Sequence, residues 1–177
     1  ADPTLRDAAC RALKAFVVAA ASSSSSSKGQ KEEEDAEQMP PEVAERYLVP
    51  HVLDALDVVD DASRRAHVSV LAAVVKRGLK FGDLQALRHA TDAEVDFFEN
   101  VAHLQTHRRS RAFRRATSLV SEVDGTSARR VLIPLALQPL RDPRAPDALR
   151  NDAATCLGAA AARLPWSRYA ELLRGLC

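Results

Sequence analysis

The chain has 177 residues, enough to bury a hydrophobic core, and its 25 Lys and Arg nearly balance 24 Asp and Glu, for a formal net charge of +1. Three cysteines without ligand or disulfide spacing exclude a disulfide framework and favour a reduced, intracellular compartment. No signal peptide is visible, and no apolar run reaches the roughly 20 residues of a membrane span. The chain does not begin with Met, so we expect a piece of a longer protein.

Hydrophobic residues recur at helical spacing along almost the whole chain, and glycine is scarce. No window alternates with the period of two that a half-buried strand requires, so the sequence predicts an all-α fold. Helices are expected at residues 4–21, 41–57, 62–79, 82–90, 92–122, 127–140, 147–164 and 166–177. The helix at 92–122 is long enough to be two helices broken near Asn100.

Residues 22–40 interrupt the helical pattern with six serines, Lys28, Gly29 and an acidic run. Such a composition buries too little apolar surface to offset the cost of ordering, so we predict a disordered loop. Two interpretations remain open: a solvated insertion, or an acidic arm that contacts basic partners.

Two parts of the chain resemble each other. Residues 44–56 match residues 128–140 at one offset (134 − 50 = 84 for the prolines), and the following helices match at 166 − 81 = 85. Half of this offset, about 42 residues, is the length of a HEAT or armadillo repeat. The sequence therefore predicts an α-solenoid of HEAT-like antiparallel helix pairs, in which Pro50 and Pro134 kink the first helix of their pairs.

The predicted units follow from this offset. They are the second helix of a truncated repeat at 1–21, the disordered loop at 22–40, a repeat at 41–81, an intervening helical repeat at 82–122, and a repeat plus the first helix of the next at 127–177.

The densest charge lies in the intervening repeat, where residues 103–115 hold five arginines and two histidines. On a helical wheel one face carries His107, Arg108, Arg111, Arg114 and Arg115. The apolar face carries Val101, Leu104, Ala112, Ala116, Leu119 and Val123, and Arg109 turns toward it. The basic face is the candidate RNA- or partner-binding surface. The alternative is a solvated face whose charge is offset by Asp92, Glu94, Asp96 and Glu99.

Other candidate sites are weaker. His103 and His107 have the spacing of zinc ligands on a helix, but no third ligand is near, so we expect neither a metal nor a cofactor. Phe97 and Phe98, like Trp166 and Tyr169, are interpreted as packing residues. The sequence contains no Gly-rich phosphate loop and no nucleophile elbow, so we expect no enzymatic activity.

The segment 96–115 is similar to a characteristic segment of the small nucleolar RNA-associated protein 20 family, also called the down-regulated-in-metastasis family. The positions that carry the resemblance are Asp96, Phe97, Phe98, Glu99, Asn100, His103, Leu104, Gln105, His107, Arg108, Arg109, Arg111, Ala112 and Arg115. Residues 164–169 are a second, less specific match. Ala102 departs from the pattern, because the family resemblance leads us to expect a basic residue there.

The resemblance implies a very large, non-catalytic HEAT-repeat scaffold of the small-subunit processome in the nucleolus, within the nucleus. Such a scaffold supports pre-18S rRNA processing and 40S ribosome biogenesis. The expected partners are pre-ribosomal RNA and processome proteins, with no membrane and no small-molecule substrate. The alternative is a HEAT-repeat transport receptor or adaptor that binds protein cargo.

Overall fold

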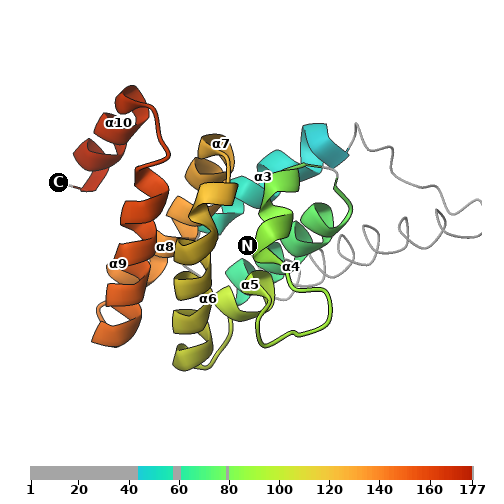
Figure 1. Cartoon of the computed structure of the whole chain (residues 1–177), viewed down its shortest axis with the longest axis horizontal. Coiled ribbons are helices and arrows are strands. Elements are labelled where there is room, and N and C mark those ends of the chain that lie inside the picture. Colours follow the sequence, from blue (N-terminus) through green and yellow to red (C-terminus); the bar gives the residue numbers. More distant parts are fainter. Residues whose placement is uncertain (1–43, 58–60, 79, 177) are drawn as a thin grey trace, which may run out of the picture.

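A computed structural model describes residues 44–57, 61–78 and 80–176, and the predictions for residues 1–40 lie outside these ranges. Within them every regular element is helical, which confirms the all-α class. Figure 1 shows the helices packed side by side, with the last helix at one end.

The elements fall into three units and a final helix. The first unit contains η1 (Ala44–Leu48), α3 (Val49–Asp54), η2 (Ala55–Asp57) and α4 (Asp61–Lys76). The middle unit contains η3 (Gly82–Leu87), α5 (Phe97–Val101), α6 (Thr106–Leu119) and η4 (Val120–Glu122). The third unit contains α7 (Gly125–Ser127), η5 (Ala128–Leu132), α8 (Ile133–Arg141) and α9 (Asp147–Ala161), and α10 (Trp166–Leu176) follows.

The first and third units share one local irregularity. Each contains a π-helical turn, η1 or η5, that becomes an α-helix at positions related by the sequence offset (133 − 49 = 84). Pro50 and Pro134 lie at the start of α3 and α8, directly after these π-helical turns. The change of helix type just before each proline is the irregularity that the structure shows at these positions.

Contacts between the units form two rows. One row runs from α4 through α5 and α6 to α9: α4 contacts α5, α5 contacts α6, and α6 contacts α9. In the other row α8 contacts η2 directly, with Gln138 Nε2 donating to the Leu56 carbonyl at 3.4 Å. Fully buried side chains from all three units, among them Leu56, Phe113 and Leu149, fill the space between.

The middle unit departs from the predicted helices at 82–90 and 92–122. The 3₁₀-helix η3 ends at Leu87, and α5 starts only at Phe97. α5 starts at Phe97 because Asp96 caps the helix there. The Asp96 carboxylate accepts hydrogen bonds from the N–H groups of Phe98 at 2.9 Å and Glu99 at 3.2 Å. The expected break is confirmed and lies just after Asn100, between the end of α5 and Thr106.

The helical wheel places Leu104 on the apolar face, and this prediction is wrong, because its side chain is 79% exposed. A wheel assumes one continuous helix, whereas Leu104 lies in the break between α5 and α6. Of the other apolar positions of that face, Val101, Ala112, Ala116 and Val123 are buried, and Leu119 is partly buried against the core.

Candidate RNA- or partner-binding surface

Arg108 is fixed in place by a buried amide. Asn100 donates from Nδ2 to the carbonyls of Ala93 at 2.8 Å and Asp96 at 2.6 Å, and its Oδ1 accepts from Arg108 Nε at 2.7 Å. Arg108 Nη1 also lies 3.1 Å from His103 Nε2. Half-buried Arg108 thus joins α6 to the irregular segment before it.

Arg115 holds the end of η3. Its Nε donates to the Leu87 carbonyl at 3.3 Å, and its Nη2 donates to the carbonyls of Ala86 at 3.3 Å and Arg88 at 3.2 Å. These oxygens lie at the C-terminal end of a helix, where a cation is favoured by the peptide dipoles and by the unpaired carbonyls. Arg115 is half-buried by this contact.

Arg111 and Arg114 are exposed, and each faces one carboxylate. Arg111 Nη1 is 3.3 Å from Glu94 Oε2, and Arg114 Nε is 3.7 Å from Asp152 Oδ2. The acidic segment before α6 therefore offsets Arg111, as the alternative interpretation expects. Exposed pairs of this kind are worth only about 0–1 kcal/mol, so both guanidinium groups remain available to a ligand.

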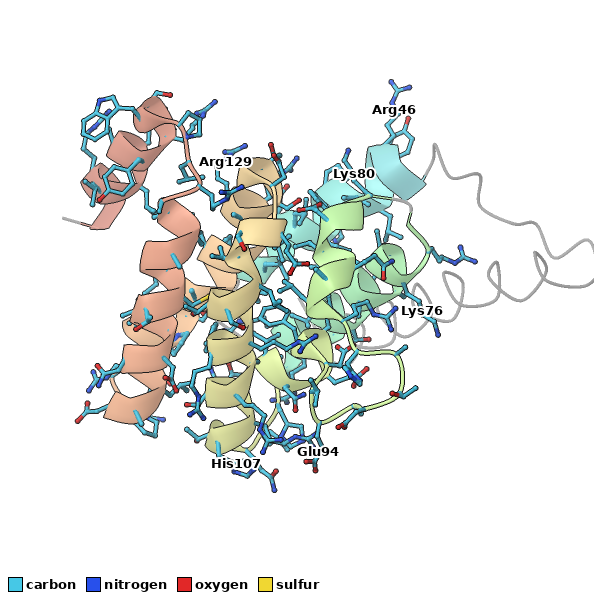
Figure 2. The ribbon with its side chains drawn as sticks, viewed as in Figure 1. Arg46, Lys76, Lys80, Glu94, His107 and Arg129 are labelled. Atoms are coloured by element: carbon cyan, nitrogen blue, oxygen red, sulfur yellow. The ribbon has the colours of Figure 1, made fainter. Side chains whose placement is uncertain are left out.

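His107 is exposed at the start of α6, where Figure 2 labels it. It lines an open hollow of about 940 Å³ between α6 and α9, together with Arg114, Asp152 and the exposed Leu104. The candidate set is thus split by the structure. Arg108 and Arg115 hold a neighbouring segment, whereas His107, Arg111 and Arg114 face solvent.

Phe97 and Phe98 are buried and pack edge to face, with ring centroids 5.2 Å apart, as the packing interpretation predicts. For Trp166 that interpretation is wrong, because its side chain is 77% exposed. It stacks on Tyr169, with the ring centroids 5.8 Å apart. The inward side chain of α10 is Leu172, which packs against the core. Six positions separate Leu172 from Trp166, or about 120° around a helix.

Basic residues on other elements were missed by the sequence reasoning. A hydrogen bond from Arg168, with the charges of Arg168, Arg174 and Arg129, holds the pKa of the Glu171 carboxyl below its usual value. Arg129 lies on η5, whereas Arg168 and Arg174 lie on α10. Because these three arginines are far apart in the sequence, no local run of basic residues indicated that their charges act on one carboxyl group.

His103, one of the two histidines with zinc-ligand spacing, is engaged locally. Its Nδ1 accepts the Gln105 N–H at 3.1 Å, while Nε2 faces Arg108. Across the described ranges no three His, Cys, Asp or Glu side chains are grouped as a metal site. In the same part of the chain no helix combines the length and the apolar character of a membrane span.

The fold and the surface define a class: an all-helical protein of packed helix pairs that exposes basic side chains along α6. The comparison with known proteins is more specific. The chain is 30% identical over 131 residues to U3 small nucleolar RNA-associated protein 20 of Saccharomyces cerevisiae, a match that covers 72% of this chain and 5% of that protein. It is 20% identical over 138 residues to the protein of the same name from Schizosaccharomyces pombe, covering 75% of this chain and 6% of that protein.

No protein-family profile matches the chain. The two relatives nevertheless carry the name of the family that the segment 96–115 resembles, so the resemblance is confirmed. The chain spans only 5–6% of the length of these relatives.

Proposed function

We propose that this chain is part of a non-catalytic scaffold of the small-subunit processome. In this role it supports pre-18S rRNA processing and 40S ribosome biogenesis in the nucleolus. The observation that carries the proposal is the similarity, over about three quarters of the chain, to two proteins named for their association with U3 small nucleolar RNA. Because the chain matches a small part of each, the role of the whole protein belongs to the proposal.

The scaffold takes the form of a HEAT-type α-solenoid. The second helices α4, α6 and α9 begin at residues 61, 106 and 147, which gives spacings of 106 − 61 = 45 and 147 − 106 = 41. Both fall within the length of a HEAT repeat. A stack of such pairs offers an extended surface on which a large particle can assemble.

Pre-ribosomal RNA or processome proteins contact the outer side of α6 in this proposal. The residues that contact the RNA or protein directly are His107, Arg111 and Arg114, which are exposed. Arg108 and Arg115 contribute by holding α6 against η3 and α5, through the hydrogen bonds to Asn100 and to the carbonyls of residues 86–88. An exposed guanidinium exchanges a weak surface ion pair for a phosphate without breaking the fold.

Binding of the 177-residue chain to a structured RNA, measured over a salt series, tests the RNA contact. Replacing Arg111 and Arg114 by Gln removes two exposed charges from α6. We expect weaker binding and a salt slope that is less steep by about 0.7–0.9 for each phosphate that the protein no longer neutralises. The matched control replaces Lys76 and Lys80, two exposed lysines labelled away from His107 in Figure 2, by Gln.

The control removes the same formal charge and should leave most of the affinity. Equal losses in the two variants would mean that the RNA senses only net charge. Undiminished binding in the α6 variant would remove RNA contact from this surface.

A further inference from the structure

The second helices of the first and third units begin with the same ion pair. In α4 the first residue, Asp61, lies 2.7 Å from Arg64 in the fourth position. In α9 the first residue, Asp147, lies 2.5 Å from Arg150, again in the fourth position. Each aspartate also lies at the N-terminal end of its helix, where the helix dipole favours a negative charge. The aspartate therefore stabilises the helix start both through the ion pair and through the dipole.

In the middle unit this pair is incomplete. The helix α6 has Arg109 in its fourth position, but its first residue is Thr106. The backbone N–H of Arg109 donates to the Gln105 carbonyl at 3.3 Å. Within the described residues its side chain makes no hydrogen bond or ion pair, and its Nε is buried without an acceptor. Burial lowers the pKa of the half-buried guanidinium, against the opposing charges of Asp61 and Asp142. A buried N–H donor without an acceptor is costly, and the aspartate that pairs with the matching arginine in α4 and α9 is missing at this helix start.

Arg109 opens into a pocket of about 510 Å³ between the units, which also exposes Arg64, Arg141 and Arg144 and three aspartates. Two of these aspartates are already engaged, Asp61 by Arg64 at 2.7 Å and Asp57 by Arg141 at 2.6 Å. The third, Asp142, accepts the Arg144 N–H at 2.9 Å. Among the described residues that line the pocket, four arginines against three aspartates leave one positive charge in excess.

We propose that this pocket receives the carboxylate of an aspartate or glutamate side chain from a partner protein, with Arg109 as its principal donor. A carboxylate carries one negative charge, which matches the excess, and its two oxygens fit the donor fork of a guanidinium. The phosphates of a nucleic-acid strand lie in its backbone, about 3.4 Å apart, whereas a carboxylate at the end of a side chain can enter the pocket alone, away from the neighbouring charges of its own chain. The inference goes beyond the proposed function, because it concerns a protein partner and a different set of residues.

The test follows the side-chain Nε–H resonance of Arg109 by NMR in the 177-residue chain, assigned by its loss in Arg109→Gln. Acetylated hexaglutamate is the probe, with hexaglutamine as its uncharged match. We expect a saturable shift of the Arg109 resonance with hexaglutamate and none with hexaglutamine.

Thr106→Asp completes the pair inside the helix, so this variant should unfold at a higher temperature and lose the response to hexaglutamate. Thr155→Asp adds the same charge at an exposed position of α9 and should keep the response. The proposal is overturned if Thr106→Asp responds like the unmodified chain, or if hexaglutamine shifts the resonance equally. A larger shift with hexauridylate would assign the pocket to nucleic acid instead. None of these outcomes depends on RNA binding at Arg111 and Arg114.

Discussion

Asn100 is one buried amide that satisfies three separate groups. From α5 it donates to the carbonyls of Ala93 and Asp96, which lie in the segment without regular structure between η3 and α5, and it accepts from the Nε of Arg108 in α6. Irregular backbone inside a protein leaves polar groups that only specific side chains can satisfy. This explains why the residues around Asn100 are distinctive in type rather than only apolar.

Asn100→Ala tests this role. The change leaves Arg108 Nε and two carbonyls without their partner, so we expect a loss of about 2–3 kcal/mol in the free energy of unfolding. Urea unfolding followed by circular dichroism measures it. Glu99→Ala, at the exposed neighbouring position, is the control and should change stability by less than about 0.5 kcal/mol. Equal midpoints for the two variants would contradict the assigned role.

Cys156 makes stability depend on alkaline pH. Burial raises the pKa of its thiol from 9.0 to about 11, against a hydrogen bond from Thr117. The unfolded thiol ionises first, so between these pH values the unfolded state holds fewer protons and the folded state loses stability. The expected loss from this group is about 1.4 kcal/mol per pH unit. Urea unfolding at pH 8 to 11 measures the slope, and Cys156→Ala should make it shallower.

Local periodicity predicted part of the buried side of α6 and missed Ser110 and Phe113, which are also buried. Ala112 and Ala116 are buried and Arg109 is half-buried, as the wheel indicates. The wheel could not predict the partners of Arg115, because its acceptors are backbone carbonyls 27–29 residues earlier in the chain. Sequence reasoning therefore found the basic segment but not which of its arginines are occupied.

At the scale of elements, the start of α7 lies against the end of α9. A Cβ on Gly125 would come within 2.6 Å of the Arg163 carbonyl oxygen, which belongs to the backbone and cannot move away cheaply. Only a residue without a side chain lets these two elements approach so closely.

Gly125→Ala should therefore destabilise the protein by about 1–3 kcal/mol, through overpacking at this junction. Gly158→Ala is a matched change within α9, where an added Cβ meets nothing within 4 Å. Helix propensity predicts that it stabilises by about 0.5–1 kcal/mol. Thermal unfolding of both variants measures the effects, and a loss of stability in Gly158→Ala, or none in Gly125→Ala, would refute this account of the junction.

Two segments matched by the repeat offset have the same form, but it is a form that the sequence did not predict. Residues 44–48 and 128–132 are equivalent, as expected, yet both are π-helical turns. Hydrophobic spacing distinguishes a helix from a strand and is too coarse to detect one wider turn. The prolines that follow were the available signal, since a proline is tolerated best where a new helical segment begins.

At the scale of the whole molecule, residues 84 positions apart meet. Asp57 and Arg141 form an exposed ion pair at 2.6 Å, next to the fully buried Leu56. Of these two contacts, apolar burial is expected to carry the greater part of the stability between the first and third units.

A double-mutant cycle on Asp57→Ala and Arg141→Ala should give a coupling of about 0.2–1 kcal/mol, smaller at 1 M salt. Leu56→Ala should cost about 2–5 kcal/mol, because it removes a buried side chain at the contact between the units. Denaturant unfolding of these variants measures both quantities. A coupling larger than the cost of Leu56→Ala would reverse the order of the two contributions.

The direct contact between the first and third units also makes the two rows unequal in length. From the first unit to the third, one row advances by a single step, from η2 to α8, while the other passes through α5 and α6 between α4 and α9. Packed helices lie about 8–10 Å apart, so the second row is longer by about one helix width. In the proposed α-solenoid, an array joined through these units would turn toward the side of η2 and α8.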